Sequence, residues 1–150
     1  MIVICDIDGT ISRPPADRLQ WAHKDWDEFY AHDFNDEPIR EMISLLNLLN
    51  CQLIFLTSRS ERVRHKTQDW LNRLICRQYG LLMRPDGDER PAHVLKLEQM
   101  HALRALYQAE LLELYPNGML VIEDDPKNVQ VLREAGFVVL QMGDRLWPHT

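Results

Sequence analysis

The sequence predicts an α/β fold in which a parallel sheet of about five strands carries helices on both faces and one small inserted segment. Two observations predict it. Short apolar runs alternate along the chain with segments of helical periodicity. The runs are apolar at consecutive positions, which is typical of strands buried on both faces. The expected arrangement is a Rossmann-like, three-layer domain spanning residues 1–150, with no repeat and no linker.

The first expected strand is Ile2–Ile7, a mostly β-branched run in which Asp6 is the one polar residue. A helix is expected to begin around Asp36, because aspartate is a typical N-cap and Pro38 fits the first turn of a helix. Apolar residues then recur at helical spacing as far as Leu49. The next two expected elements are a strand at residues 51–56 (CQLIFL) and a helix with one apolar face at residues 61–76.

The second half continues the alternation of strands and helices. The expected strands are residues 79–83, 119–122 and 137–142, and the expected helices are residues 92–114 and 127–135. The long helix ends at Pro116-Asn117-Gly118, a run of residues that favours turns. Gly136 is typical of the residue that follows a helix C-terminus, so it closes the last helix.

One segment, at about residues 13–37, interrupts the alternation. It contains Pro14-Pro15 and then several aromatic residues among many charges: Trp21, Trp26, Phe29, Tyr30 and Phe34. One interpretation is a partly helical surface excursion whose aromatic side chains fold onto the core. The interpretation that we favour is a small cap over a site, because the segment closely follows the first strand.

The composition bounds the class of protein. Hydrophobic residues make up 45% of the 150 residues and charged residues 27%, which is typical of a globular domain. The net charge of −6 argues against broad coating of nucleic acid, although it leaves room for a local basic groove. Residues 57–96 form such an exception, because nine Lys or Arg and five Asp or Glu give them a local charge of +4.

The cysteines and the apolar runs indicate the compartment. Cys5, Cys51 and Cys76 are odd in number and form no CxxC pair, so we expect buried free thiols rather than disulfides or a zinc site. Free thiols are typical of a reducing, cytoplasmic environment. No apolar run approaches the roughly 18–20 residues of a membrane span, and the first residues resemble a strand rather than a signal peptide. We therefore expect no membrane association.

Polar residues follow the expected strands where those strands end. In a parallel α/β sheet, ligands bind beyond the carboxyl ends of the strands. The residues that follow the strands there, together with one lysine of the long helix, are Asp6, Asp8, Gly9, Thr10, Thr57, Ser58, Arg59, Arg84, Asp86, Lys96, Glu123, Asp124 and Asp125. They come from four segments of the chain and are expected to converge on one edge of the sheet.

These residue types suit phosphoryl transfer. Asp6 and Asp8 are two residues apart in an extended chain, so their carboxylates point to the same side and repel each other unless a cation lies between them. Oxygen ligands without Cys or His favour Mg²⁺, and Asp124 can add a third carboxylate. Lys96 can compensate a phosphate, and Thr57 can donate to its oxygens.

Each feature taken alone also has a structural interpretation. A lone pair of aspartates is often part of a solvated loop, and a lysine in a first helical turn is usually solvated. The run Glu123-Asp124-Asp125 could be an acidic helix start. It is the order of all these features in one chain that favours a phosphoryl-transfer site.

The order of four motifs resembles the haloacid dehalogenase superfamily of phosphohydrolases. The motifs are DIDGT at residues 6–10, LTSR at residues 56–59, Lys96, and VIEDDPKN at residues 121–128. The resemblance implies that Asp6 is a nucleophile that forms an aspartyl-phosphate. It implies that Asp8 first protonates the leaving alkoxide and then activates water, while its backbone carbonyl ligates Mg²⁺.

The same resemblance implies roles for the other motif residues. Thr57 binds phosphoryl oxygens, Lys96 neutralises nucleophile and phosphate, and Asp124 joins Asp6 and Asp8 in holding Mg²⁺. Further substrate contacts are expected from Thr10 and Ser58, and the expected neighbours of the metal are Glu123, Asp125 and Asn128.

A more detailed similarity is to the 3'-phosphatase domain of polynucleotide kinase-phosphatases of the bacteriophage type. It rests on LTSRSERVR, Thr67, Trp70-Leu71 and LLMRPDGDER ahead of Lys96. It implies that Arg59, Arg84 and Arg90 contact the substrate from loops around the mouth of the site. The chain departs from that family in having no arginine after Glu123-Asp124-Asp125, and the kinase motif GxxxxGK[ST] is absent. A separate kinase or ligase is therefore an expected partner.

Three hypotheses remain at this point. The first is a Mg²⁺-dependent phosphomonoesterase that removes 3'-phosphates from nucleic-acid ends or nucleotides. The second is a phosphatase of a small phosphorylated metabolite or sugar. The third is a receiver-like module that binds phosphate without turning it over. Receivers lack the second aspartate of DIDGT, the general acid that turnover needs.

Overall fold

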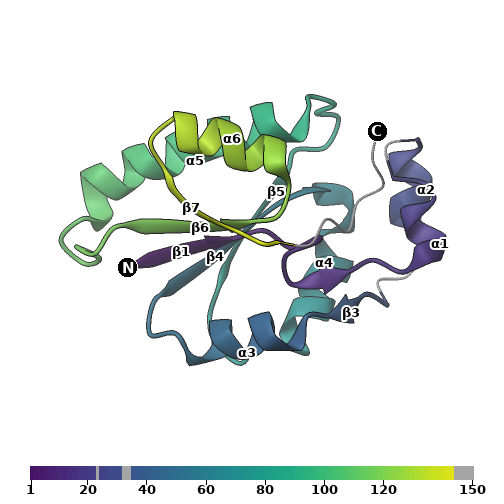
Figure 1. Cartoon of the computed structure of the whole chain (residues 1–150), viewed down its shortest axis with the longest axis horizontal. Coiled ribbons are helices and arrows are strands. Elements are labelled where there is room, and N and C mark those ends of the chain that lie inside the picture. The colour runs from purple at the N-terminus through teal and green to yellow at the C-terminus, as the bar shows by residue number, and fades with distance from the viewer. Residues whose placement is uncertain (23, 32–34, 144–150) are drawn as a thin grey trace.

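The computed structural model describes residues 1–22, 24–31 and 35–143. Its centre is a parallel five-stranded sheet in the order β5-β4-β1-β6-β7 (Figure 1). The strands are β1 (Ile2–Cys5), β4 (Gln52–Ser60), β5 (Gly80–Arg84), β6 (Met119–Glu123) and β7 (Val138–Gln141). The α/β fold with five parallel strands that the sequence predicts is confirmed.

Strand β1 lies in the middle of the sheet and sets its register. Cys5 pairs with Phe55 of β4 on one side and with Ile122 of β6 on the other. The chain builds the sheet outward from β1 through β4 to β5, and then crosses to β6 and β7 on the opposite side. Such a reversal of strand order opens a crevice at the carboxyl edge of the sheet. The residues that follow β1 therefore lie between those that follow β4 and β6.

Helices cover both faces of the sheet, which gives three layers (Figure 1). The helical elements are α3 (Arg40–Leu48), the 3-10 turn η1 (Glu61–Val63), α4 (Arg64–Asn72), α5 (Ala92–Leu106), the π-helical turn η2 (Tyr107–Leu111) and α6 (Pro126–Glu134). One hydrophobic cluster joins α3 and α4 to the side chains of Val3 and Cys5. A second cluster joins α5 and α6 to Ile2 and Ile4. Strand β1 thus contributes alternate side chains to two cores, as its uninterrupted apolar run predicts.

The helix expected from Asp36 begins later. Glu37–Pro38 forms a short strand, β3, antiparallel to β2 (Ser12–Arg13), and α3 starts at Arg40. The prediction of Asp36 as an N-cap is wrong, because its carboxylate is buried and accepts hydrogen bonds from two arginine side chains instead.

Two other helix boundaries also differ from the sequence prediction. The segment expected as one helix over residues 61–76 begins with the 3-10 turn η1 and ends at Asn72. The long helix stays α-helical only to Leu106 and then widens into the π-helical turn η2. Both segments still pack one apolar face on the sheet, so the layers are as expected.

The inserted segment contains two short helices, α1 (Ala16–Leu19) and α2 (Trp26–Ala31), followed by β3. Figure 1 shows α1 and α2 together at one end of the molecule, on the side of the sheet's carboxyl edge. Phe29 is buried, whereas Trp26 is exposed. Phe34, which the sequence analysis grouped with these aromatic residues, lies outside the described residues.

The cysteines only partly follow expectation. All three are free, but Cys5 alone is buried; Cys51 is half-buried and Cys76 is exposed. The prediction of three buried thiols is therefore wrong for Cys76, which lies beyond the end of α4. Within the described ranges, no helix combines the length and the apolar character needed to cross a membrane.

Candidate active site

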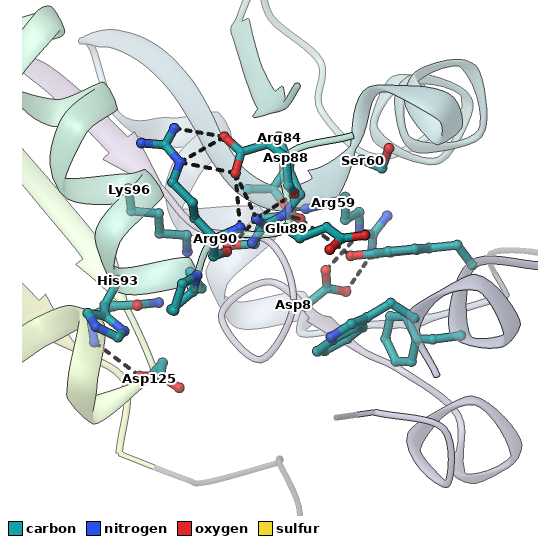
Figure 2. A pocket seen from close by; sticks show the side chains of 18 of the residues that line it. Asp8, Arg59, Ser60, Arg84, Asp88, Glu89, Arg90, His93, Lys96 and Asp125 are labelled. Carbon is teal, nitrogen blue, oxygen red and sulfur yellow. Dashed lines mark hydrogen bonds and ion pairs between the residues drawn. The ribbon is translucent and has the colours of Figure 1, made fainter. Parts of the chain in front are cut away.

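A cavity of about 1090 Å³ opens at the carboxyl edge of the sheet (Figure 2). Strand ends, the loop between β5 and α5, and the inserted segment all line it. From the residues expected at the site, those that line the cavity are Asp6, Asp8, Thr57, Ser58, Arg59, Arg84, Asp86, Arg90, Lys96, Glu123, Asp124, Asp125 and Asn128. The sequence prediction that these segments converge on one edge is met by the geometry.

Three carboxylates and one ammonium group form the centre of the cavity. Asp6, Glu123 and Asp124 each offer an oxygen atom within 4.8 Å of the others, and all three side chains are buried. Lys96 Nζ lies 2.7 Å from Asp6 Oδ1 and 2.6 Å from Glu123 Oε2. The cluster forms because Asp6 follows β1 and Glu123 ends β6, the neighbouring parallel strand.

The electrostatics of this cluster favour a bound divalent cation. Burial and the charge of Glu123 raise the pKa of Asp6 to about 7, although Lys96 opposes the shift. Burial and the charges of Asp6 and Glu123 raise the pKa of Asp124 to about 9. Three carboxylates beside one ammonium group leave an excess of two negative charges, which a divalent cation with oxygen ligands would balance. The donor set therefore fits Mg²⁺.

Gly9 makes room for the Asp124 carboxylate. Its φ is +87°, in the left-handed region, and a Cβ built on it would lie 2.0 Å from Asp124 Oδ2. No residue with a side chain could occupy this position without moving Asp124. The Thr10 hydroxyl donates to Asp124 Oδ1 at 3.4 Å, and Thr10 is fully buried. Thr10, expected to contact substrate, thus lies behind the carboxylate and outside the cavity lining.

Asp8 belongs to a second, separate charge network. The Arg59 guanidinium grips its carboxylate with two hydrogen bonds, Nε to Oδ2 at 2.7 Å and Nη2 to Oδ1 at 2.6 Å (Figure 2). Arg59 Nη2 also donates to Asp36 Oδ2 at 2.8 Å. Arg18, from α1, pairs with the other oxygen of Asp36. Four buried, alternating charges thus connect the inserted segment to Asp8.

This network determines the charge of Asp8. Burial alone would raise the pKa of its carboxyl, but the charge and hydrogen bonds of Arg59 outweigh burial and hold the pKa below its usual value. Asp36 shows the opposite balance, because burial and the charge of Asp8 together raise its pKa more than its two arginine neighbours lower it. Asp8 therefore stays ionised to lower pH than Asp6 and Asp124.

The two residues after the apolar part of β4 face the same cavity. Thr57 is buried and its hydroxyl accepts a hydrogen bond from the Arg59 backbone amide at 3.2 Å. The Ser58 carbonyl accepts hydrogen bonds from Arg84 Nε at 3.0 Å and from Tyr30 Oη at 3.4 Å. The Ser58 hydroxyl is buried and has no hydrogen-bond partner within the described part of the chain.

Residues 1–145 match the model of the polynucleotide kinase PNKP phosphatase domain. The chain belongs to this family. It is a phosphatase domain of the haloacid dehalogenase superfamily, as its motifs indicate.

One curated protein and two solved structures are also similar to this chain. The chain is 28% identical over 101 residues to a putative bifunctional polynucleotide kinase/RNA ligase of Autographa californica nuclear polyhedrosis virus, covering 64% of this chain and 14% of that protein. It resembles chains of two solved structures of the Pnkp1/Rnl/Hen1 complex, one of them described as an RNA repair complex. The TM-scores are 0.65 and 0.63 at 23% and 22% identity. These matches cover 96% and 94% of this chain but 47% and 42% of those chains.

The arginines that the PNKP-type resemblance assigned to substrate differ from expectation in their placement. Arg59 does not lie in a loop: it is within β4 and fully buried. Arg84 is the last residue of β5 and donates to the backbone carbonyls of Asp88 and Arg90. Arg90 pairs with Asp88 (Figure 2) and also with Glu98. Arg84 and Arg90 therefore stabilise the loop between β5 and α5 in this structure.

The three acidic residues of the fourth motif have different roles. The Asp125 carboxylate caps α6, because it accepts hydrogen bonds from the backbone amides of Lys127 and Asn128 at 2.8 and 3.0 Å. The helix-start interpretation of the acidic run therefore holds for Asp125, whereas Asp124 points into the carboxylate cluster. Glu123, expected only beside the metal, is itself part of that cluster and holds Lys96.

Sequence reasoning left several residues of the site unassigned. Arg18 and Asp36 complete the charge network of Asp8, and Tyr30 and Arg62 line the cavity. A buried charge pair between segments 18 residues apart has no local sequence pattern. The only available signal was the mixture of aromatic and charged residues in the insert.

Proposed function

We propose that this domain hydrolyses phosphomonoesters through a phosphoryl group carried on Asp6, with Mg²⁺ as cofactor. The observation that carries the proposal is the pairing of Asp6 with Lys96 at 2.7 Å inside a buried carboxylate cluster. Lys96 opposes the effect of burial on the pKa of Asp6 and so favours the ionised carboxylate, which a nucleophile requires. Asp6, Asp124 and Glu123 would hold the metal, which supplies charge to balance the phosphoryl oxygens.

In the first step, an Asp6 oxygen forms a bond to phosphorus while the bond from phosphorus to the ester oxygen breaks. The leaving alkoxide takes a proton from Asp8. In the second step, the Asp8 carboxylate accepts a proton from water, the water oxygen attacks phosphorus, and inorganic phosphate leaves Asp6. The proton that Asp8 gives in the first step returns to it in the second.

The lowered pKa of Asp8 disfavours proton donation to the leaving alkoxide and favours proton acceptance from water. An arriving phosphate brings negative charge next to Asp8, which raises the pKa of its carboxyl and offsets the effect of Arg59. Arg59 also fixes the orientation of Asp8 through two parallel hydrogen bonds. We propose that Arg59 positions the acid–base group and does not contact the substrate.

The proposed substrate is the 3'-phosphate of a polynucleotide end. Membership in the PNKP phosphatase domain family supports it. The cavity also has far more volume than a phosphoryl group fills, so it has room for one or more nucleotides. The matched viral protein is named as a bifunctional polynucleotide kinase/RNA ligase, and the matched proteins are more than twice as long as this chain. We therefore propose that a kinase or ligase acts together with this domain.

The phosphatase of a small metabolite or sugar remains the second candidate, and one observation favours it. Arg84 donates to backbone carbonyls of Ser58, Asp88 and Arg90, and Arg90 pairs with Asp88 and Glu98. Both arginines are therefore engaged by described residues of the protein rather than presented as a pair to a polynucleotide backbone.

A release assay for inorganic phosphate separates these candidates. It compares oligonucleotides with a 3'-phosphate or a 5'-phosphate, 3'-mononucleotides and sugar phosphates, each with Mg²⁺ and with excess chelator. The proposal predicts the highest kcat/KM for the 3'-phosphate oligonucleotide and no turnover in chelator. Faster turnover of sugar phosphates would favour the second candidate. Full activity in chelator would remove the metal from the mechanism.

A further inference from the structure

We propose that Trp26 stacks on the nucleobase of the terminal nucleotide, so that the inserted segment forms a base-binding wall of the site. The inference rests on the proposed function, because it concerns the substrate of the same cavity. Trp26 lines that cavity and keeps 43% of its surface exposed. A single exposed tryptophan on a protein surface is ordinary. One that shares a cavity with a phosphoryl-transfer site offers its ring to whatever is attached to the phosphate.

Two neighbouring aromatic side chains hold the Trp26 ring in place. It stacks on Tyr30 with an interplanar angle of 25° and meets Phe29 edge-on, with ring centroids 5.2 Å apart. Phe29 is buried, and the Arg18 guanidinium lies 4.5 Å from the centre of its ring. Because these three aromatic rings and one buried cation pack together, Trp26 loses little conformational entropy when a base stacks on it.

The position of Trp26 matches the reach of one nucleoside. Tyr30 bridges the two parts of the site: its hydroxyl donates to the Ser58 carbonyl, next to Thr57 at the phosphoryl end, and its ring stacks on Trp26. Trp26 is therefore separated from the phosphoryl-binding strand end by a single aromatic side chain. A 3'-phosphate is joined to its own base through one sugar, and Asp6 and Trp26 line the same cavity. We therefore place the base against α2 when the phosphate lies at Asp6.

Ion pairs hold α2 against the opposite wall of the cavity. Asp27, next to Trp26, pairs with Arg62 at 2.8 Å, and Arg62 also pairs with Asp86 in the loop after β5 at 3.0 Å. The Arg62 side chain is 58% exposed, so it can also meet a backbone phosphate. Aromatic rings beside accessible cations are typical of sites that bind single-stranded nucleic acid. A sugar phosphate has no planar group for such a ring, which is why the inference concerns substrate class.

The test compares two 3'-phosphate oligonucleotides that carry the same number of phosphates. One ends in a normal thymidine, and the other ends in an abasic tetrahydrofuran residue. Trp26→Ala should lower kcat/KM on the thymidine end by about five- to hundredfold, since base stacking on an aromatic side chain contributes about that factor per base. It should leave kcat/KM on the abasic end unchanged. Trp26→Phe keeps an aromatic face and should recover most of the loss.

A matched control is Trp21→Ala, because Trp21 belongs to the same segment but does not line the cavity. It should affect both substrates equally. An equal effect of Trp26→Ala on both substrates, or no effect on either, would overturn the stacking inference while leaving the phosphatase proposal intact. A wild-type protein that hydrolyses other esters but neither oligonucleotide would overturn the proposed function itself. Turnover of p-nitrophenyl phosphate by each variant shows that its catalytic centre is folded.

Discussion

Replacing Arg59 with glutamine should destabilise the folded protein by about 3–5 kcal/mol, the usual cost of leaving a buried charge without its partner. Arg59 is fully buried between two carboxylates, Asp8 and Asp36. Asp36 keeps its ion pair with Arg18 when Arg59 is removed. Asp8 retains only a 3.3 Å hydrogen bond from the Ser12 hydroxyl, so one carboxylate loses its cation. The expected loss of stability is therefore that of one buried carboxylate left without its cation.

Chemical denaturation followed by circular dichroism measures this loss directly. For a domain of this length, each kcal/mol shifts Tm by about 2–4 °C, so thermal unfolding should also report a drop of about 6–20 °C. Arg62→Gln provides the control, because its ion pairs are exposed and should contribute only about 0–1 kcal/mol.

A double variant separates two causes of the stability loss: the uncompensated charge of Asp8 and the lost packing of the Arg59 side chain. Adding Asp8→Asn to Arg59→Gln removes the uncompensated carboxylate, so the double variant should be more stable than Arg59→Gln alone. The reasoning would be refuted if Arg59→Gln cost no more than the Arg62 control, or if neutralising Asp8 made the Arg59 variant still less stable.

Three further predictions follow from the same geometry. Asp8→Asn should be nearly inactive toward alkyl phosphates but less impaired with p-nitrophenyl phosphate, whose leaving group needs no proton; equal losses of kcat on both substrates would remove the acid role. Gly9→Ala should raise the Mg²⁺ concentration for half-maximal activity, because the new Cβ would lie 2.0 Å from Asp124 Oδ2, and should destabilise the fold by about 1–2 kcal/mol through backbone strain; an unchanged Mg²⁺ titration would contradict the assigned role of Asp124. Without divalent metal, the free energy of unfolding should fall as pH rises from about 4 through 7 and toward 9, because folded Asp6 and Asp124 retain protons that the unfolded chain has released. Calorimetry should show that Mg²⁺ raises Tm more at pH 8 than at pH 6. A larger rise at pH 6 would mean that these carboxyls are not the ligands.

The sheet and its catalytic edge could be predicted because their causes are local. The run Ile2–Cys5 is apolar at every position. This pattern is typical of a strand whose two faces are both buried. Residues that follow such strands share one edge whatever the loops do, so Asp6 and Asp124 could be brought together without knowing a single contact. Gly9 could not be linked to Asp124 in this way, because close approach is visible only in three dimensions.

The boundary of β4 shows why the arginine was misplaced. The apolar run ends at Leu56, and sequence reasoning ended the strand there. In the structure the strand continues to Ser60, which pairs with Arg84 after a shift in register. The continuation places Arg59 inside the protein, where two acidic residues compensate its charge. A run of apolar residues predicts a buried strand. It cannot predict the part of a strand whose buried side chains are charged.

Asp36 was misread for a related reason. An aspartate ahead of a proline and an apolar helical pattern is a common N-cap, and nothing nearby in the sequence argued against it. Its partners, Arg18 and Arg59, come from separate segments, and burial of all three favours ion pairing over capping. Ion pairs between distant segments are set by the tertiary fold, so local propensity cannot reveal them.

The central claim is that Asp6 carries the phosphoryl group. The most direct measurement is mass spectrometry of protein quenched in acid during turnover of a 3'-phosphate oligonucleotide with Mg²⁺, run beside an assay of Asp6→Asn. The account predicts a phosphoryl adduct on Asp6 rather than Asp8, and a loss of kcat on the order of 10⁴-fold or more in the variant, with its fold retained. Turnover by pure Asp6→Asn, or an adduct on another residue, would contradict it.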